Sequence, residues 1–261
     1  MQGKQKLSKC ALRRDTILKT LEQNEFVNVT DLGNKLNTSA VTIRKDLEYL
    51  ESQGLLIRTH GGAKKCTNID SNLRIQHKQT EKSQIARAAS ALVNKGDFLF
   101  INTGSTCFYV IEELKKKTDF TVVTNSYTIL SSLVTTPSIT TFFLGGQVNT
   151  DMKITVGDDV LEQLDKYTAD KLFLGMDGID IEMGATTYNH VEDAIMRKMM
   201  MRSKEKILVV DDSKFDKVTF AKIADLKDFD TIITNYSERT VDLIEQIRDM
   251  GLRVICAPAA N

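Results

Sequence analysis

The apolar positions in the first 65 residues predict three short helices. The first is expected to end near Asn24, and the second to begin at Thr30, whose hydroxyl suits a helix cap. Ser39 suits the cap of a third, longer helix, and Gly54 is expected to end it. The residues expected to face a shared core are Leu12, Ile17, Leu18 and Leu21 in the first helix, Leu32 and Leu36 in the second, and Val41, Ile43, Leu47 and Leu50 in the third.

Short apolar runs next to these helices predict a small sheet. Phe26 to Val29 alternates between apolar and polar residues, as a half-buried strand does. Leu55 to Arg58 predicts another strand, and His60-Gly61-Gly62 predicts a tight turn that leads to Lys64-Lys65. Two helices joined by a turn and then a hairpin are the order of a winged helix-turn-helix, whose later helix enters the major groove of DNA.

The pattern changes after this head. Residues 66–79 have no clear periodicity and predict a linker, so we expect domains at 1–65 and 80–261. From Thr80 onward an amphipathic helix leads into alternating strands and helices, which favours an α/β fold with a mainly parallel sheet and helices on both faces. The strands are expected at Phe98–Ile101, Phe120–Val123, Ile139–Leu144, Lys171–Leu174, Ile207–Val210, Thr231–Ile233 and Leu252–Ile255, and the later helices near 106–116, 127–135, 157–166, 190–203 and 237–250.

Composition narrows the class of protein. The chain is 41% hydrophobic and 27% charged, and no apolar run approaches the roughly 18 residues of a membrane span. The first ten residues are polar and basic with no apolar signal core, which favours a cytoplasmic location. The cysteines form no C-x-x-C pair and His60, His77 and His190 share no ligand spacing, so we expect reduced thiols, no metal and no cofactor.

The charge is unevenly distributed along the chain, although the formal net charge is zero. The first 65 residues hold 12 Lys and Arg against 7 Asp and Glu, whereas the remainder holds 23 against 28. A basic head on an acidic body suggests that only the head meets a polyanion. Chance asymmetry is the alternative, and charge alone does not decide between the two.

The third predicted helix carries the candidate DNA-reading residues. Thr42 and Arg44 lie near its N-terminus on the outward side, where recognition helices touch base edges, and an Arg can bridge two acceptors of guanine. Hydroxyl and basic groups nearby suit phosphate. A packing module with a solvated basic face is the alternative. The candidate DNA contacts are Thr38, Ser39, Thr42, Arg44, Lys45, Arg58, His60 and Lys64.

Small polar clusters follow five of the predicted strands. Parallel strands end at one edge of a sheet, where α/β proteins bind ligands, and Gly and Ser/Thr before a helix offer amides to an anion. Each cluster alone is also what an ordinary turn needs. No G-x-G-x-x-G and no P-loop pattern occurs, so a phosphorylated metabolite is favoured over a nucleotide. The candidate effector residues are Asn102, Gly104, Ser105, Thr106, Thr124, Asn125, Gly145, Gly146, Asp177, Gly178 and Lys214.

The candidate residues of the head and the body, with the motifs around them, resemble those of the DeoR family of bacterial transcriptional regulators. The resemblance implies operator DNA as a partner, repression of a sugar-catabolism operon, and release by a phosphorylated sugar, possible classes being amino-sugar and hexose phosphates. Lys45 and Thr38 stand where the family usually has Arg and Val, and Asn102 replaces its usual Asp. The motifs are Arg13-Arg14-x-x-Ile17, Val27-x-Val29-x-x-Leu32, Ser39-x-x-Thr42-Ile43-Arg44-Lys45-Asp46-Leu47-x-x-Leu50-Glu51-x-x-Gly54, Arg58-x-His60-Gly61-Gly62-Ala63 and Asp211-x-Ser213-Lys214-Phe215.

The body, from about Lys82 to Val254, resembles the family's ligand-sensing domain, which is related in fold to ribose-5-phosphate isomerase. An isomerase-like enzyme with an appended DNA-binding head is therefore the rival interpretation, with Asp177 or Asp180 and Glu192 transferring protons beside Lys214. An oligomerisation body without a ligand is a third. An isomerase has no need of a basic head, so we expect a regulator with no catalytic residues. We also expect a homodimer or higher homo-oligomer, with contacts near Met196–Met201.

Overall fold

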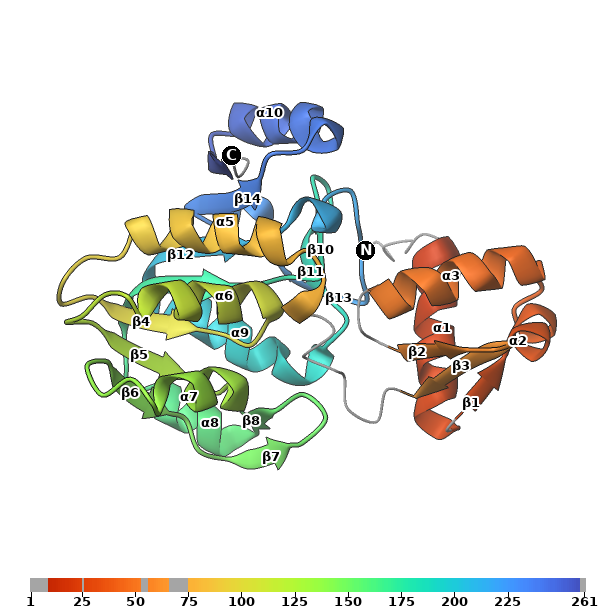
Figure 1. The fold of residues 1–261 in the computed structure, drawn as a ribbon, viewed down its shortest axis with the longest axis horizontal. Helices are drawn as coiled ribbons and strands as arrows, with labels where there is room; N and C mark the ends of the chain where they lie inside the picture. Colours follow the sequence, from red (N-terminus) through yellow and green to blue (C-terminus); the bar gives the residue numbers. More distant parts are fainter. Residues whose placement is uncertain (1–8, 25, 53–55, 66–74, 259–261) are drawn as a thin grey trace, which may run out of the picture. The chain divides into compact units, whose positions relative to one another are not determined.

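The computed structural model describes residues 9–24, 26–52, 56–65 and 75–258 (Figure 1). The chain divides into an N-terminal unit, Met1–His77, and a C-terminal unit, Lys78–Asn261. Most of the predicted linker, residues 66–74, lies outside the described residues. Its last residue, Gln79, is already the first residue of a helix.

The N-terminal unit is the winged helix-turn-helix that the sequence predicts. Its three strands form an antiparallel sheet in the order β1-β3-β2 against three helices. Ile17, Leu32, Ile43, Leu47 and Leu50 are buried together in its core, as their spacing predicts. The elements are α1 (Lys9–Gln23), β1 (Phe26–Asn28), α2 (Val29–Lys35), α3 (Ala40–Ser52), β2 (Leu56–Thr59) and β3 (Gly62–Lys65).

Several details of the head differ from the sequence predictions. Leu12, which was expected in the core, is 48% exposed on α1. Asn28, and not Thr30, caps α2: its Oδ1 accepts a hydrogen bond from the backbone N–H of Thr30 at 2.7 Å. Val41 is 60% exposed, because it lies two residues before Ile43 and so about 200° around the helix from the buried stripe. The predicted end of α3 at Gly54 lies outside the described residues.

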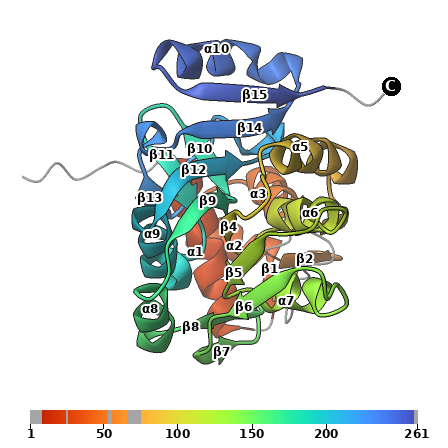
Figure 2. The same cartoon turned by 90° about the vertical axis from the view of Figure 1, so that its left-hand side faces the viewer.

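A seven-stranded parallel sheet forms the centre of the C-terminal unit (Figure 2), and every predicted strand of the body belongs to it. Its order is β15-β14-β12-β9-β4-β5-β6. The chain thus reverses its direction of growth between β4 and β9. The strands are β4 (Phe98–Ile101), β5 (Thr121–Thr124), β6 (Thr140–Phe143), β9 (Ala169–Leu174), β12 (Ser203–Val209), β14 (Thr231–Asn235) and β15 (Arg253–Ala257).

Helices cover both faces of this sheet (Figures 1 and 2), so two apolar layers form its core. One layer is covered by α5 (Gln79–Ala91), α6 (Ser105–Leu114) and α7 (Tyr127–Leu133). The other is covered by α8 (Asp158–Leu164), α9 (Asp193–Met201) and α10 (Val241–Asp249). Met196, Met199 and Met200 are buried in the second layer, whereas Met201 is 76% exposed.

The sequence predictions miss two small antiparallel sheets. One is the hairpin of β7 (Gln147–Asn149) and β8 (Ile154–Val156), and the other joins β10 (Gly178–Asp180), β11 (Gly184–Thr187) and β13 (Ala221–Ala224). The helix predicted at 190–203 is also shorter. It divides into the 3-10 turn η1 (His190–Glu192) and α9, and β12 already begins at Ser203.

Candidate functional site

The exposed side of α3 carries the candidate base-reading residues. Arg44 and Lys45 are both exposed. Ser39 caps the helix as predicted, since its Oγ accepts a hydrogen bond from the backbone N–H of Thr42 at 3.2 Å. The Ser39 and Thr42 hydroxyls are 2.9 Å apart. The first turn of α3 therefore presents two hydroxyls next to two cationic side chains.

A buried carboxylate fixes the opposite side of α3. Asp46 is 1% exposed and forms ion pairs with two arginines of α1, Arg13 and Arg14, the latter at 2.9 Å. The Arg14 guanidinium also lies 3.5 Å from the centre of the Tyr49 ring. Removing one partner of such a buried network leaves uncompensated charge, so these contacts hold the orientation of α3 relative to α1.

The wing is the two-residue hairpin between β2 and β3. Its turn, His60-Gly61, is exposed, and Gly61 has a φ of +85°, which favours glycine. At Gly62 a Cβ atom would lie 2.1 Å from the carbonyl oxygen of Val27, so glycine lets β1 and β3 pair closely. Arg58 is exposed, and its backbone N–H and guanidinium contact Glu51 at 2.8 Å and 3.8 Å.

The candidate effector site lies where the sheet reverses its order, between β4 and β9. Asn102 directly follows β4 and is 1% exposed. Its Oδ1 accepts hydrogen bonds from the Gly175 N–H at 3.0 Å and the Cys107 thiol at 3.2 Å. Burial, with a smaller contribution from Glu192, raises the pKa of Cys107 to about 12. Asn102 therefore joins the loops after β4 and β9.

The loop after β4 leads directly into α6. Gly104 precedes the helix with a φ of +151° and is exposed, and Ser105 is half-buried in the first turn. Thr106 is only 6% exposed. Gly104 and Ser105 therefore place backbone N–H groups and a hydroxyl at the positive end of a ten-residue helix, as an anion requires.

The candidate residues at the end of β5 lie in the interior of the C-terminal unit. Thr124 and Asn125 are both fully buried. The Asn125 amide donates to the Thr155 carbonyl at 3.0 Å and to Glu192 Oε1 at 3.1 Å, while its own Oδ1 is buried without a hydrogen-bond partner. Buried acceptors are normally paired. Asn125 thus acts within the floor of the site and retains one unused acceptor.

Glu192 connects the strand-end loops. It is fully buried and accepts hydrogen bonds from Asn125, from the backbone N–H of Thr103 and, at 3.5 Å, from Asn189. Burial raises its pKa to about 8, Asp177 adds to the rise, and the hydrogen bonds oppose it. The loops after β4 and β5 are therefore fastened to η1 by one carboxyl group.

Asp177 belongs to the same cluster. It is 8% exposed, and its Oδ2 accepts hydrogen bonds from the Thr187 hydroxyl at 3.0 Å and the Tyr188 N–H at 3.1 Å. Thr187 Oγ1 in turn accepts from the Asn189 N–H at 3.0 Å. Asp177 therefore ties the loop after β9 to the segment that ends in Glu192.

Two of the candidate glycines have a packing reason for being glycine. A Cβ at Gly178 would lie 2.5 Å from the Lys217 carbonyl oxygen, and one at Gly146 would lie 2.8 Å from the Val156 carbonyl oxygen. Gly145 exchanges hydrogen bonds with the Gln163 side chain at 2.7 and 3.0 Å. Close packing explains Gly178 and Gly146 without a ligand, whereas the backbone hydrogen bonds of Gly145 do not require glycine, and any role of the three in ligand binding stays a prediction.

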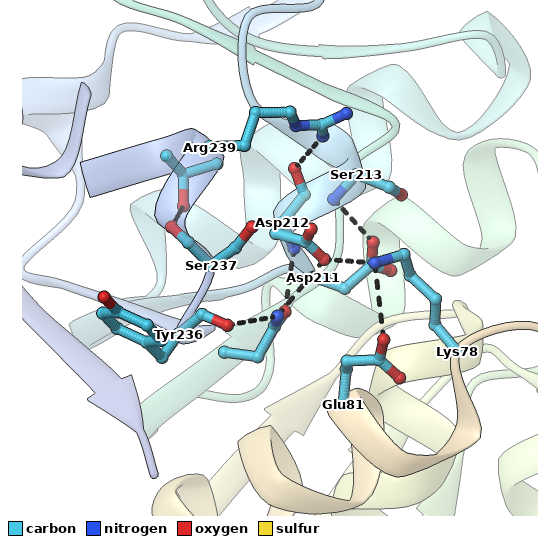
Figure 3. A network of polar contacts seen from close by, with 10 residues as sticks. Lys78, Glu81, Asp211, Asp212, Ser213, Tyr236, Ser237 and Arg239 are labelled. Atoms are coloured by element: carbon cyan, nitrogen blue, oxygen red, sulfur yellow. Dashed lines mark hydrogen bonds and ion pairs between the residues drawn. The ribbon is translucent and has the colours of Figure 1, made fainter. Parts of the chain in front are cut away.

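Lys214 belongs to the turn η2 (Asp212–Lys214) after β12, and β9 alone separates β12 from β4 in the sheet. It is half-buried. Burial alone would raise the pKa of the neighbouring Asp211, but the charge of Lys214, the Ser213 hydrogen bond and Lys82 lower it overall. A dense polar network surrounds this turn and reaches Lys78 at the start of α5 (Figure 3).

Sequence reasoning missed several members of these clusters. Glu192 entered only as a proton-transfer group of the rival enzyme, and Thr187, Lys78 and Lys82 were not singled out as site residues. Lys82 is 2% exposed, which is rare for a lysine and signals a charged partner nearby. The spacing of residues in the sequence does not reveal this burial, because Lys82 lies in an amphipathic helix, where a lysine is normally exposed to solvent.

The described residues contain neither a metal-binding cluster nor a membrane-spanning helix. In the described ranges no group of three or more His, Cys, Asp or Glu side chains is arranged to hold a metal ion. No described helix has the length and apolar character to cross a membrane.

Comparisons with known proteins match both units. A family model described as the DeoR-like helix-turn-helix domain matches residues 13–68, and one described as the DeoR C terminal sensor domain matches residues 77–236. The repressor GlcR of Bacillus subtilis is 32% identical over 223 residues, covering 84% of this chain and 86% of its own. The uncharacterized regulator FruR of the same organism is 33% identical, covering 88% and 93%.

Solved structures with a similar fold include ribose 5-phosphate isomerase A of Methanocaldococcus jannaschii. It is 19% identical, with a TM-score of 0.39, and the match covers 51% of this chain and 53% of the isomerase. A similarity this low carries no argument about function.

Proposed function

The chain belongs to the DeoR family of transcriptional regulators, and on this premise we propose that it represses a sugar-catabolism operon and releases the operator when a phosphorylated sugar binds. It is a DNA-binding regulator and not an enzyme, since the matching families and relatives are regulators. We place it in the cytoplasm, because that is where a bacterial operator is read.

The observation that supports DNA reading best is the way α3 is presented. Its inner side is fixed by the buried Asp46 network, and Arg44 and Lys45 remain exposed on its outer side. A rigid helix with a free Arg is the geometry that base recognition needs. Around it, the proposed supporting contacts are Thr38, Ser39, Thr42, Arg58, His60 and Lys64.

The proposed effector site is the edge of the sheet around the β4–β9 reversal. Gly104, Ser105 and Thr106 would hold the phosphate at the N-terminus of α6, with Lys214 as the cation. Asp177 would accept from sugar hydroxyls near the floor that Asn102, Thr124 and Asn125 form. The rival isomerase is disfavoured by the family, and also because Glu192 is fully buried and already accepts three hydrogen bonds.

Lys214→Ala is expected to weaken phosphosugar binding by about tenfold or more, because a charge-assisted hydrogen bond contributes about 1.5–3 kcal/mol. The variant should still bind operator DNA in the absence of effector. Calorimetry with fructose 1-phosphate, glucosamine 6-phosphate, ribose 5-phosphate and glycerol 3-phosphate, each beside its unphosphorylated form, measures this.

Lys204→Ala is the matched control, since Lys204 belongs to the same strand-and-turn segment but is 78% exposed and pairs with Asp170 on the surface. It should bind effector normally. The effector proposal is wrong if the unphosphorylated forms bind as well as the phosphates and Lys214→Ala has no effect.

We also propose a homodimer or higher homo-oligomer. One recognition helix reads few base pairs, and paired heads on a two-fold axis would read an inverted repeat. The exposed Met201, beside the buried Met196, Met199 and Met200, is a candidate contact on α9. Light scattering at micromolar concentration is expected to give at least twice the 29.3 kDa chain mass, and a monomer with and without DNA contradicts the proposal.

A further inference from the structure

Lys78 occupies the boundary between the two units. It is the first residue of the C-terminal unit, directly after His77. Its backbone is left-handed, with φ of 53° and ψ of 44°, and its carbonyl accepts the Lys82 N–H at 3.0 Å to begin α5. Non-glycine residues adopt this conformation at a cost, so surrounding contacts must stabilise it.

Those contacts come mainly from the η2 turn. The Lys78 ammonium pairs with Asp212 Oδ1 and lies 3.5 Å from Glu81 (Figure 3). Asp212 is itself fixed by β14, since its N–H donates to Asn235 Oδ1 at 2.9 Å and its Oδ1 accepts from Asn235 Nδ2 at 3.2 Å. Arg239 donates to the Asp212 carbonyl at 2.9 Å. The start of α5 is thus attached to a well-anchored acidic residue.

The preceding residue, Asp211, is part of the same turn as Lys214: its carbonyl accepts the Lys214 N–H at 3.0 Å, and its Oδ1 accepts the Ser213 N–H at 2.9 Å. Asp211 is 1% exposed, and against the effect of this burial the positive charges of Lys214 and Lys82 help to lower its pKa. Lys78 is attracted to Asp211 as well as to Asp212. Two adjacent carboxylates therefore share three lysines, of which Lys214 is the proposed phosphate ligand and Lys78 begins the unit.

We propose that the Lys78–Asp212 ion pair couples occupancy of Lys214 to the chain segment that enters the C-terminal unit. This inference rests on the proposed effector site. A phosphate dianion bound to Lys214 neutralises the positive charge that stabilises Asp211. A buried carboxylate that loses its counter-charge must gain another from a neighbouring cation. Lys78 is then drawn toward Asp211, and its hold on Asp212 and Glu81 weakens. An effector changes DNA affinity only through such a difference between two states.

The first test measures coupling in the full chain. For wild type, Lys78→Met, Asp212→Asn and the control Lys95→Met, calorimetry gives the affinity for the four phosphosugars, and fluorescence anisotropy gives operator affinity with and without them. Lys95 pairs with Asp119 on the surface and is 78% exposed. Lys78→Met and Asp212→Asn are expected to bind phosphosugar within about twofold of wild type while the effector-induced change in operator affinity falls about fivefold or more. Unchanged coupling in both variants overturns the inference.

The second test needs no effector. Lys214→Met removes the charge that a phosphate would occupy, so hydrogen exchange at the Lys82 amide, which donates to Lys78, should accelerate severalfold. In the Lys78→Met background the same change at Lys214 should add nothing. Equal acceleration in both backgrounds, or none in either, overturns the inference. Failure of every phosphosugar to bind would instead count against the proposed function alone.

Discussion

Glu192→Gln is expected to stabilise the protein relative to wild type by an amount that grows as the pH rises from about 4.5 to about 8. Burial raises the pKa of Glu192 to about 8, whereas the ordinary value is 4.5. Between these values the folded state keeps a proton that the unfolded state has lost, so the free energy of unfolding falls with rising pH by at most about 1.4 kcal/mol per unit. Glutamine does not titrate and removes this slope.

Urea unfolding of both proteins at pH 5, 6, 7 and 8 measures the difference. Glu162→Gln on α8 is the matched control, because Glu162 is exposed, and its curve should remain parallel to wild type. A constant difference between wild type and Glu192→Gln at all four pH values would show that the carboxyl group does not bind a proton on folding.

Arg44→Ala is expected to weaken binding to the specific operator by about 1–3 kcal/mol, or roughly 5- to 150-fold, and to reduce discrimination between sites. Arg44 is exposed on α3, and the Asp46 network that holds this helix does not include it, so folding should be unaffected. Anisotropy titrations with operator and scrambled duplexes measure both effects.

Lys64→Ala separates base reading from general attraction to phosphate. Lys64 is exposed on β3. Its loss should weaken binding to all duplexes to a similar degree and make the dependence on salt shallower. Wild-type operator affinity in Arg44→Ala would contradict the assignment of α3 as the reading helix.

The sequence predicts the parallel sheet well and the antiparallel additions poorly, for a physical reason. Strands such as Phe98–Ile101, which is buried from Leu99 to Ile101, are continuous apolar runs. β10 and β11 are three and four residues long and begin with glycine, and β11 pairs with β13 across an intervening helix and strand. Such strands are defined by partners far away in the sequence, which a local pattern does not reveal.

For the candidate site as well, local features are predicted from the sequence, whereas contacts between distant segments are not. Strand-end clusters are local, so the sequence places Asn102, Gly104 and Asp177 after the strands that they follow in the structure, and their role in binding stays a prediction. Whether a residue in such a loop lies at the surface depends on what packs over it. The sequence does not reveal, for example, that Asn125 is fully buried and donates a hydrogen bond to Glu192 of η1. The role proposed for Lys78 depends on its ion pair with Asp212, which lies far along the chain and which the local sequence does not reveal.

The reactivity of the buried Cys107 thiol can report local opening of the structure. The thiolate is the nucleophile that attacks maleimides and oxidants, and a thiol with no exposed surface and a pKa of about 12 supplies almost no thiolate at neutral pH. Cys10 and Cys256 are half-buried and should be labelled first. Because Cys107 donates to Asn102, its modification requires the junction of β4 and β9 to open. The rate at which mass spectrometry detects alkylated Cys107 therefore measures how often the proposed effector site at this junction opens, with no added probe.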